Sequence, residues 1–278
     1  METLGLIAGK SDYPLLFARA AKAKGLKIVA VGIEGETRPE LQALVDKFFW
    51  VNLGELGKAL EIFKSEGIKK AVMAGGVTKS RIFNEALKID GLMKSILVKA
   101  LDKRDDTLLS VITATLKSAG VELLDSTLFL EDLLPEEGLL KKMRPSKEQE
   151  EDIKFGAKIA KEIAGLDIGL SVFVKDKAVI AVEDIEGTDA MIRRGGRLAG
   201  PAGVVIKVAR PKQNMKFDIP VIGPQTIRSM AETKTACIAI EAKKTLIIDK
   251  EETIVFADNN GIAVVAVNPH TKIFGERV

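Results

Sequence analysis

The stretch EDIEGTDAMIRR at residues 183–194 contains four carboxylates and two arginines around a Gly-Thr turn. Carboxylate oxygens bind Mg²⁺ together with phosphate oxygens of a substrate, and guanidinium groups bind phosphate through paired hydrogen bonds. Side chains that can bind the metal ion and side chains that can bind the phosphates of a pyrophosphate therefore lie within one short segment. The alternative is a solvated turn in which Thr188 or Asp189 caps a helix, which explains the density of charge less well.

A second polar segment, residues 207–226, surrounds one acid, Asp218, with cations. An aspartate among cations stays ionised and suits metal binding or the orientation of a water molecule. Three prolines restrict the segment, and Gly223-Pro224 begins a helix whose free amides suit an anion. The alternative is a basic surface loop. The cations are Lys207, Arg210, Lys212 and Lys216.

Two glycine turns follow predicted strands in the first half, at Gly9 and at Gly75-Gly76. Ligands of open α/β sheets lie at the carboxyl ends of strands, and a turn that opens a helix offers amides to an anion. Only Gly9 matches the dinucleotide fingerprint, and the chain has no P-loop motif, so NAD binding is not supported. The alternative for Gly9 is a glycine needed only for a tight turn.

The composition excludes several classes of protein. The 278 residues include one histidine, His270, and one cysteine, Cys237, which argues against Ser-His-Asp hydrolysis and against zinc sites built on histidine or cysteine. The 42 basic and 39 acidic residues give a formal charge of +3, too balanced to indicate a nucleic-acid partner. The opening METLGLIAGK has no basic region before an apolar core, so we expect no secretory signal, and no apolar run approaches the ~20 residues of a membrane span. We therefore expect a cytoplasmic protein that contacts membranes at most peripherally.

Strand and helix patterns alternate in the first half of the chain, which implies a parallel sheet covered on both faces. The second half reads as a mixed α/β domain, and Ser146 with Gln149 forms a capping box. The predicted strands are 4–8, 28–33, 48–51, 71–74, 121–124, 168–174, 178–182, 204–208, 237–241, 246–248 and 262–267, and the predicted helices are 13–23, 57–66, segments of 82–119, 146–164, 188–194, 224–234 and 250–258.

The stretch 131–151 is charged, carries two prolines and a glycine, and has no strand pattern. Such composition is typical of an interdomain linker. We therefore predict a first domain over 1–131, a linker over 132–145 and a second domain over 146–278.

The opening LGLIAG, the segment EGTDAMIRR and the stretch FDIPVIGPQTI together resemble the LpxI family, from Leu4 to about Pro269. These are the UDP-2,3-diacylglucosamine pyrophosphatases of lipid A biosynthesis. The chain departs from the family at Lys10-Ser11, where a more glycine-rich turn is expected. The resemblance implies a Rossmann-like N-terminal domain with a parallel sheet, a mixed α/β C-terminal catalytic domain, and substrate bound between them. It also implies that the family's essential aspartate falls on Asp218.

The implied reaction is Mg²⁺-assisted hydrolysis of the pyrophosphate bond, with water directed at the sugar-side phosphorus, to UMP and 2,3-diacylglucosamine 1-phosphate. Mn²⁺ is expected to support the reaction in place of Mg²⁺. Because the substrate is a lipid-linked UDP-sugar, we expect peripheral contact with the inner face of the membrane. A homo-oligomer remains open. Alternatives are a nucleotide-sugar oxidoreductase, a non-catalytic nucleotide–lipid carrier and a metal-independent binding module.

The chemistry of the two polar segments suggests a role for each residue. We expect catalysis from Asp218 and Asp189, and metal binding from the same two carboxylates with Glu186. The candidates for substrate binding are Gly9, Gly75, Gly76, Thr188, Arg193, Arg194, Lys207, Lys212, Gln213 and Thr226.

Overall fold

A computed structural model describes residues 2–78, 81, 88–100 and 105–269 of the chain, so His270 lies outside the described residues. The chain forms two compact units. The N-terminal unit comprises 1–131 and 214–218, and the C-terminal unit comprises 132–213 and 219–278. The sequence predicts a second domain that includes residues 214–218, whereas their contacts assign them to the N-terminal unit.

The N-terminal unit contains a five-stranded parallel sheet in the order β3-β2-β1-β4-β5. This is the order of the first five strands of a doubly wound fold, which confirms the predicted parallel α/β architecture. The strand order reverses between β1 and β4, so the carboxyl ends of these strands form the switch point. The strands are β1 (Thr3–Ala8), β2 (Lys27–Ile33), β3 (Lys47–Val51), β4 (Lys70–Ala74) and β5 (Glu122–Leu123).

Helices connect these strands because apolar residues recur at helical spacing between them. Pro14 lies in the first turn of α1, and Gly25, at a φ of 77°, follows its end. Side chains of α2, α3 and α4 share one buried cluster with β2 and β3, whereas α1 contacts β2 and β4. The segments are α1 (Tyr13–Ala23), α2 (Leu56–Ser65), α3 (Gly91–Lys99), α4 (Asp105–Ser118) and the 3-10 helices η1 (Pro39–Ala43) and η3 (Glu131–Leu133).

The C-terminal unit contains a six-stranded mixed sheet in the order β6-β13-β11-β9-β7-β8. The central strands β9, β11 and β13 are parallel, β7 is antiparallel to both β8 and β9, and β6 is antiparallel to β13. A small parallel pair joins β10 to β12. The strands are β6 (Gly138–Leu139), β7 (Ser171–Lys175), β8 (Ala178–Val182), β9 (Val204–Lys207), β10 (Val221–Ile222), β11 (Cys237–Glu241), β12 (Leu246–Ile247) and β13 (Ala263–Val267).

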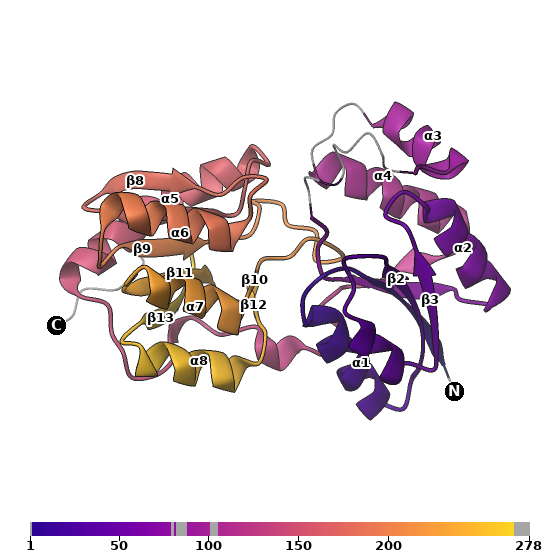
Figure 1. Ribbon diagram of the computed structural model, residues 1–278, viewed down its shortest axis with the longest axis horizontal. Helices are drawn as coiled ribbons and strands as arrows, with labels where there is room; N and C mark the ends of the chain where they lie inside the picture. Colours follow the sequence, from indigo (N-terminus) through magenta and orange to yellow (C-terminus); the bar gives the residue numbers. More distant parts are fainter. Residues whose placement is uncertain (1, 79–80, 82–87, 101–104, 270–278) are drawn as a thin grey trace. The chain divides into compact units, whose positions relative to one another are not determined.

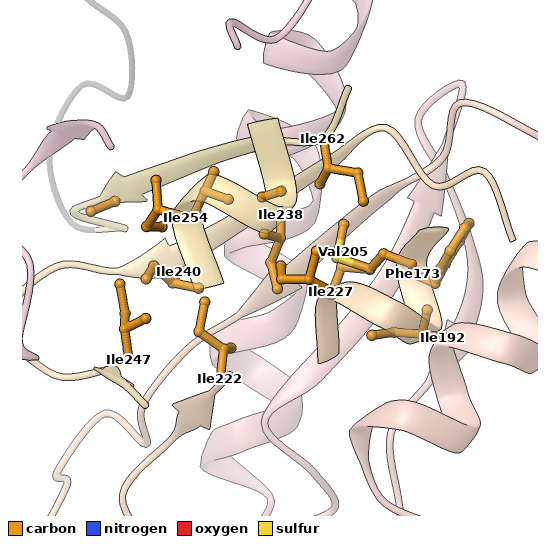
Figure 2. Close-up of a cluster of buried hydrophobic side chains, with 14 of the residues drawn as sticks. Phe173, Ile192, Val205, Ile222, Ile227, Ile238, Ile240, Ile247, Ile254 and Ile262 are labelled. Carbon is orange, nitrogen blue, oxygen red and sulfur yellow. The ribbon is translucent and has the colours of Figure 1, made fainter. Parts of the chain in front are cut away.

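Alternate residues of β11 enter the two cores of this unit. Ile238 and Ile240 pack with helices α6, α7 and α8, which lie over one face of the sheet (Figure 1, Figure 2). Cys237 and Ala239 pack with α5 on the other face. The period of two residues is that of a strand buried on both sides. The helices are α5 (Lys147–Gly165), α6 (Thr188–Ala199), α7 (Pro224–Glu232) and α8 (Lys250–Asn259).

The stretch predicted as a linker, 132–145, belongs to the C-terminal unit by its contacts and supplies strand β6 at the edge of the sheet. A strand of two residues shows no alternation of polar and apolar side chains, so its pairing cannot be predicted from periodicity. Among the described residues, no helix is long and apolar enough to cross a membrane.

Replacing Ser146 by alanine should increase hydrogen exchange in the first turn of α5 about fivefold, since an N-cap is worth about 1 kcal/mol. The Ser146 hydroxyl accepts from the Gln149 amide at 3.3 Å, and the Gln149 side chain accepts from the Ser146 amide at 2.9 Å. Mass spectrometry of peptides from α5 measures the change. Ser65→Ala is the control, because that hydroxyl only donates to the Ile62 carbonyl. Unchanged exchange in the first variant would contradict the cap.

Candidate functional site

The two predicted glycine turns pack against each other at the carboxyl edge of the N-terminal sheet. The Gly9 amide donates to the Ala74 carbonyl at 2.8 Å, and the Lys10 amide donates to the Gly76 carbonyl at 2.7 Å. A Cβ on Gly9 would lie 2.2 Å from the Gly76 carbonyl oxygen, and Gly75 has a φ of 80°. Close backbone packing thus explains why glycine occupies positions 9 and 75. The amides of Gly9 and Lys10 already donate to backbone carbonyls. Substrate binding by Gly9, Gly75 and Gly76 stays a prediction.

Asp218 belongs to a short segment, 214–218, that attaches to this same edge. The Met215 carbonyl accepts from both the amide and the hydroxyl of Ser126, at 2.8 and 2.7 Å. Ser126 follows β5, and its own carbonyl accepts from the Tyr13 hydroxyl at the start of α1. Burial raises the pKa of Tyr13, which keeps the phenol protonated as the donor. The segment that ends at Asp218 is therefore anchored to the N-terminal unit through Met215, Ser126 and Tyr13.

The backbone of Asp218 is in the left-handed region, at a φ of 47°. This conformation costs most residues roughly 1–2 kcal/mol, and aspartate is one of the side chains that adopt it more readily. The neighbouring Phe217 side chain is buried, and the Lys216 amide donates to the Asn214 side chain at 3.1 Å. The turn is thus fixed immediately before a residue in an energetically unfavourable conformation, and such conformations are frequent at functional sites.

At the carboxyl edge of the C-terminal sheet, Lys207 joins two segments that are far apart in sequence. Its ammonium group donates to Thr188 Oγ1 at 2.7 Å and to Ser171 Oγ at 3.2 Å, and lies 3.5 Å from Glu183 Oε2. The Thr188 hydroxyl in turn donates to Glu183 Oε1 at 2.7 Å. The Lys207 side chain is only 5% exposed. The structure thereby brings two predicted substrate residues, Thr188 and Lys207, into direct contact at the start of α6.

The arginines of the predicted pyrophosphate site are engaged in ion pairs with protein carboxylates. Arg193 pairs with Glu232 of α7 at 2.8 Å, which raises the pKa of its guanidinium. Arg194 pairs with Glu186 and also donates to the Val182 carbonyl at 2.9 Å. As phosphate ligands, both arginines would have to exchange these partners. Glu186 is therefore part of an ion pair rather than of a carboxylate cluster.

The remaining candidates are placed on three different features. Asp189 lies in the first turn of α6, where the helix dipole favours a negative charge. Lys212 is exposed, and the Gln213 side chain accepts from the Arg210 amide at 3.1 Å. Thr226 is buried in the first turn of α7.

The three predicted metal ligands do not form one cluster within either unit. Asp218 belongs to the N-terminal unit, whereas Asp189 and Glu186 belong to the C-terminal unit. Across the part of the chain that the structure describes, no three His, Cys, Asp or Glu side chains are grouped to hold a metal. Mg²⁺ usually binds one or two carboxylates together with substrate phosphates, and metal binding by Asp218, Asp189 and Glu186 stays a prediction.

Sequence reasoning missed a buried ion pair that binds the 207–226 segment at the backbone of Ala209. Lys161 of α5 pairs with Glu241, the last residue of β11, at 3.0 Å, and both side chains are nearly inaccessible. One signal was present: Lys161 stands four residues after Ala157 and three before Ala164, on the apolar stripe of α5. A lysine on a buried stripe needs a partner. Its partner, 80 residues further along the chain, could not be predicted.

Comparison with known proteins matches nearly the whole chain to one family. A model of the LpxI N-terminal domain matches residues 3–133, and a model of the LpxI C-terminal domain matches residues 136–265. One curated relative is the UDP-2,3-diacylglucosamine pyrophosphatase LpxI of Caulobacter vibrioides. It is 32% identical over 283 residues, covering 98% of this chain and 100% of the relative.

Solved structures give only distant likenesses. The biotin carboxylase domain of the Hydrogenobacter thermophilus 2-oxoglutarate carboxylase has a TM-score of 0.29 at 12% identity, over 70% of this chain and 41% of that chain. The N5-carboxyaminoimidazole ribonucleotide synthetase of Thermotoga maritima has a TM-score of 0.24 at 15% identity, over 66% and 41%. The chain thus spans less than half of these proteins, and scores this low support no conclusion.

Proposed function

The chain belongs to the LpxI family, and from that membership we propose that it hydrolyses the pyrophosphate bond of UDP-2,3-diacylglucosamine. The products would be UMP and 2,3-diacylglucosamine 1-phosphate, in a step of lipid A biosynthesis. The proposal rests on 32% sequence identity, over 98% of this chain, with a relative named UDP-2,3-diacylglucosamine pyrophosphatase LpxI.

The charges at the carboxyl edge of the C-terminal sheet suit a diphosphate substrate. Lys207 is a buried cation whose Thr188 partner lies at the start of α6, where backbone amides and the helix dipole also attract anions. We assign both residues to the diphosphate, with Lys212, Gln213 and the arginine pair as further contacts. Buried donors of this kind stabilise the charge that develops in a phosphoryl-transfer transition state.

Asp218 is the residue we assign to the attacking water, either directly or as a metal ligand. Its support is the unfavourable φ of 47° in a turn that is anchored at the switch-point edge. Asp189, in the first turn of α6, is the second carboxylate that we assign to catalysis. When bound, Mg²⁺ or Mn²⁺ would neutralise the diphosphate and lower the pKa of water.

The substrate is a nucleotide joined to two acyl chains, so the enzyme must reach it at or near a membrane. We propose peripheral contact with the inner face of the membrane, and catalysis on the cytoplasmic side. A homo-oligomer is compatible with this assignment.

The function is tested by incubating the pure protein with UDP-2,3-diacylglucosamine, with and without Mg²⁺, and measuring UMP. We expect UMP release only with the metal, and in H₂¹⁸O the label should enter the sugar phosphate and not UMP. Tight substrate binding without UMP release would instead indicate a nucleotide–lipid carrier. Binding of nicotinamide cofactors in a parallel titration would favour an oxidoreductase, and either result would overturn the proposal.

A further inference from the structure

Two buried ion pairs fix the chain where it leaves strand β9. The Lys161 ammonium donates to the Ala209 carbonyl at 2.7 Å, and Glu241 accepts from the Ala209 amide at 2.9 Å. Both polar groups of the Ala209 backbone thus bind one charged pair, whose members are 3.0 Å apart. The next residue, Arg210, is held by Asp167 through its guanidinium, at 2.7 Å from Nε.

Burial of these charges is costly, so a purely structural role explains them poorly. Ion pairs taken out of water often stabilise a fold no more than apolar side chains of the same volume would. Burial lowers the pKa of Lys161, and the hydrogen bond that Lys161 donates to Glu241 only partly opposes that shift. Glu241 keeps a further partner in Lys244 at 2.9 Å. The arrangement therefore fixes backbone geometry at a cost in stability.

The backbone fixed in this way leads directly to the residues of the proposed site. Lys207 precedes Ala209 by two residues, and Lys212 with Gln213 follows it. After Gln213 the chain passes to residues 214–218 of the N-terminal unit, which end at Asp218. An error of about 1 Å in such a support can lower a rate about a hundredfold.

We propose that Lys161 and Glu241 are positioning residues, which hold the Ala209 backbone and thereby set the geometry of Lys207, Lys212 and Gln213 at the diphosphate. This inference rests on the proposed function, because it assigns the segment to the same substrate. Neither residue touches the substrate in this assignment.

The test compares two double variants that differ only in one acceptor. Lys161→Met/Glu241→Gln removes both charges but keeps an oxygen for the Ala209 amide, whereas Lys161→Met/Glu241→Leu removes that oxygen as well. We expect kcat to fall about tenfold to a hundredfold in the leucine variant. The kcat of the glutamine variant should be at least about fivefold higher than that of the leucine variant. KM should change by less than about threefold in both, since the lost geometry is required mainly in the transition state.

Hydrogen exchange of peptides spanning 208–213 gives a readout that does not depend on activity. Exchange should be faster in the leucine variant than in the glutamine variant, because the Ala209 amide has lost its acceptor. Asp152→Asn is the matched control: Asp152 is a buried carboxylate of α5 that accepts from the amides of Asp176 and Lys177 in the β7–β8 turn. That variant should change neither kcat nor exchange at 208–213.

If the wild-type protein turns over substrate, equal kcat in the two double variants would overturn the inference. Equal hydrogen exchange at 208–213 in the two variants would overturn it as well. Loss of kcat in Asp152→Asn to the same extent would also overturn it, since any buried carboxylate would then have the effect. Should the leucine variant not fold, Lys161→Met alone tests the other bond, because Glu241 retains Lys244 while the Ala209 carbonyl loses its donor; unchanged kcat in that variant would overturn the inference. If the wild-type protein releases no UMP, the proposed function fails, and the exchange data alone decide whether the pair fixes Ala209.

Discussion

Asp218→Asn should lower kcat for UMP release by roughly 10²–10⁴-fold while substrate affinity and fold stay unchanged. Asparagine has the shape of aspartate and adopts the left-handed region about as readily, so the turn at a φ of 47° is preserved. What the substitution removes is the negative charge that would orient water or bind a metal ion. Steady-state kinetics at saturating substrate measure kcat, and equilibrium binding of UDP-2,3-diacylglucosamine measures affinity.

The matched control for this prediction is Asp176→Asn. Asp176 is an exposed aspartate with a φ of 52° in the β7–β8 turn, so it has the same backbone conformation outside the proposed site. The control should keep wild-type kcat. Asp218→Asn with more than about a tenth of wild-type kcat would contradict the role of Asp218, because loss of a general base or metal ligand costs more than that.

The sequence predicts well those elements that depend on local patterns. The helix Tyr13–Ala23 begins and ends as predicted, because Pro14 and Gly25 mark its two ends. Strand Cys237–Glu241 also has the predicted bounds, since its four apolar residues, 237–240, form a continuous run that suits a strand buried on both faces. The capping box at Ser146 follows from two residues three positions apart.

Features that depend on distant contacts could not be predicted in this way. Strands β6 and β10 have two residues each, too few for a period to appear. Residues 214–218 lie in the second half of the chain, yet Met215 bonds to Ser126, 89 residues earlier. Nothing in the local composition indicates such a partner. The membership of Asp218 in the N-terminal unit therefore required the structure.

For the candidate site, the sequence identified the kinds of side chain but not their partners. The cations and carboxylates of 183–194 suggested a phosphate site, and Thr188 does contact Lys207. The same charges also satisfy each other, as Arg194 does with Glu186. Which charge faces a ligand and which faces a neighbour depends on helix packing, as the Arg193–Glu232 pair between α6 and α7 illustrates. Composition alone cannot separate these cases.

Removal of divalent metal should abolish UMP release without changing the stability of the protein. A structural metal site would couple metal binding to folding, but no cluster of three ligand side chains occurs among the described residues. One or two carboxylates bind Mg²⁺ weakly until substrate phosphates complete the coordination. Excess EDTA should therefore stop turnover and leave the unfolding temperature unchanged, and added Mg²⁺ or Mn²⁺ should restore the rate. Ca²⁺-saturated EDTA is the control for direct effects of the chelator. Full activity in excess EDTA would remove the metal from the mechanism, and a lower unfolding temperature would indicate a structural metal instead.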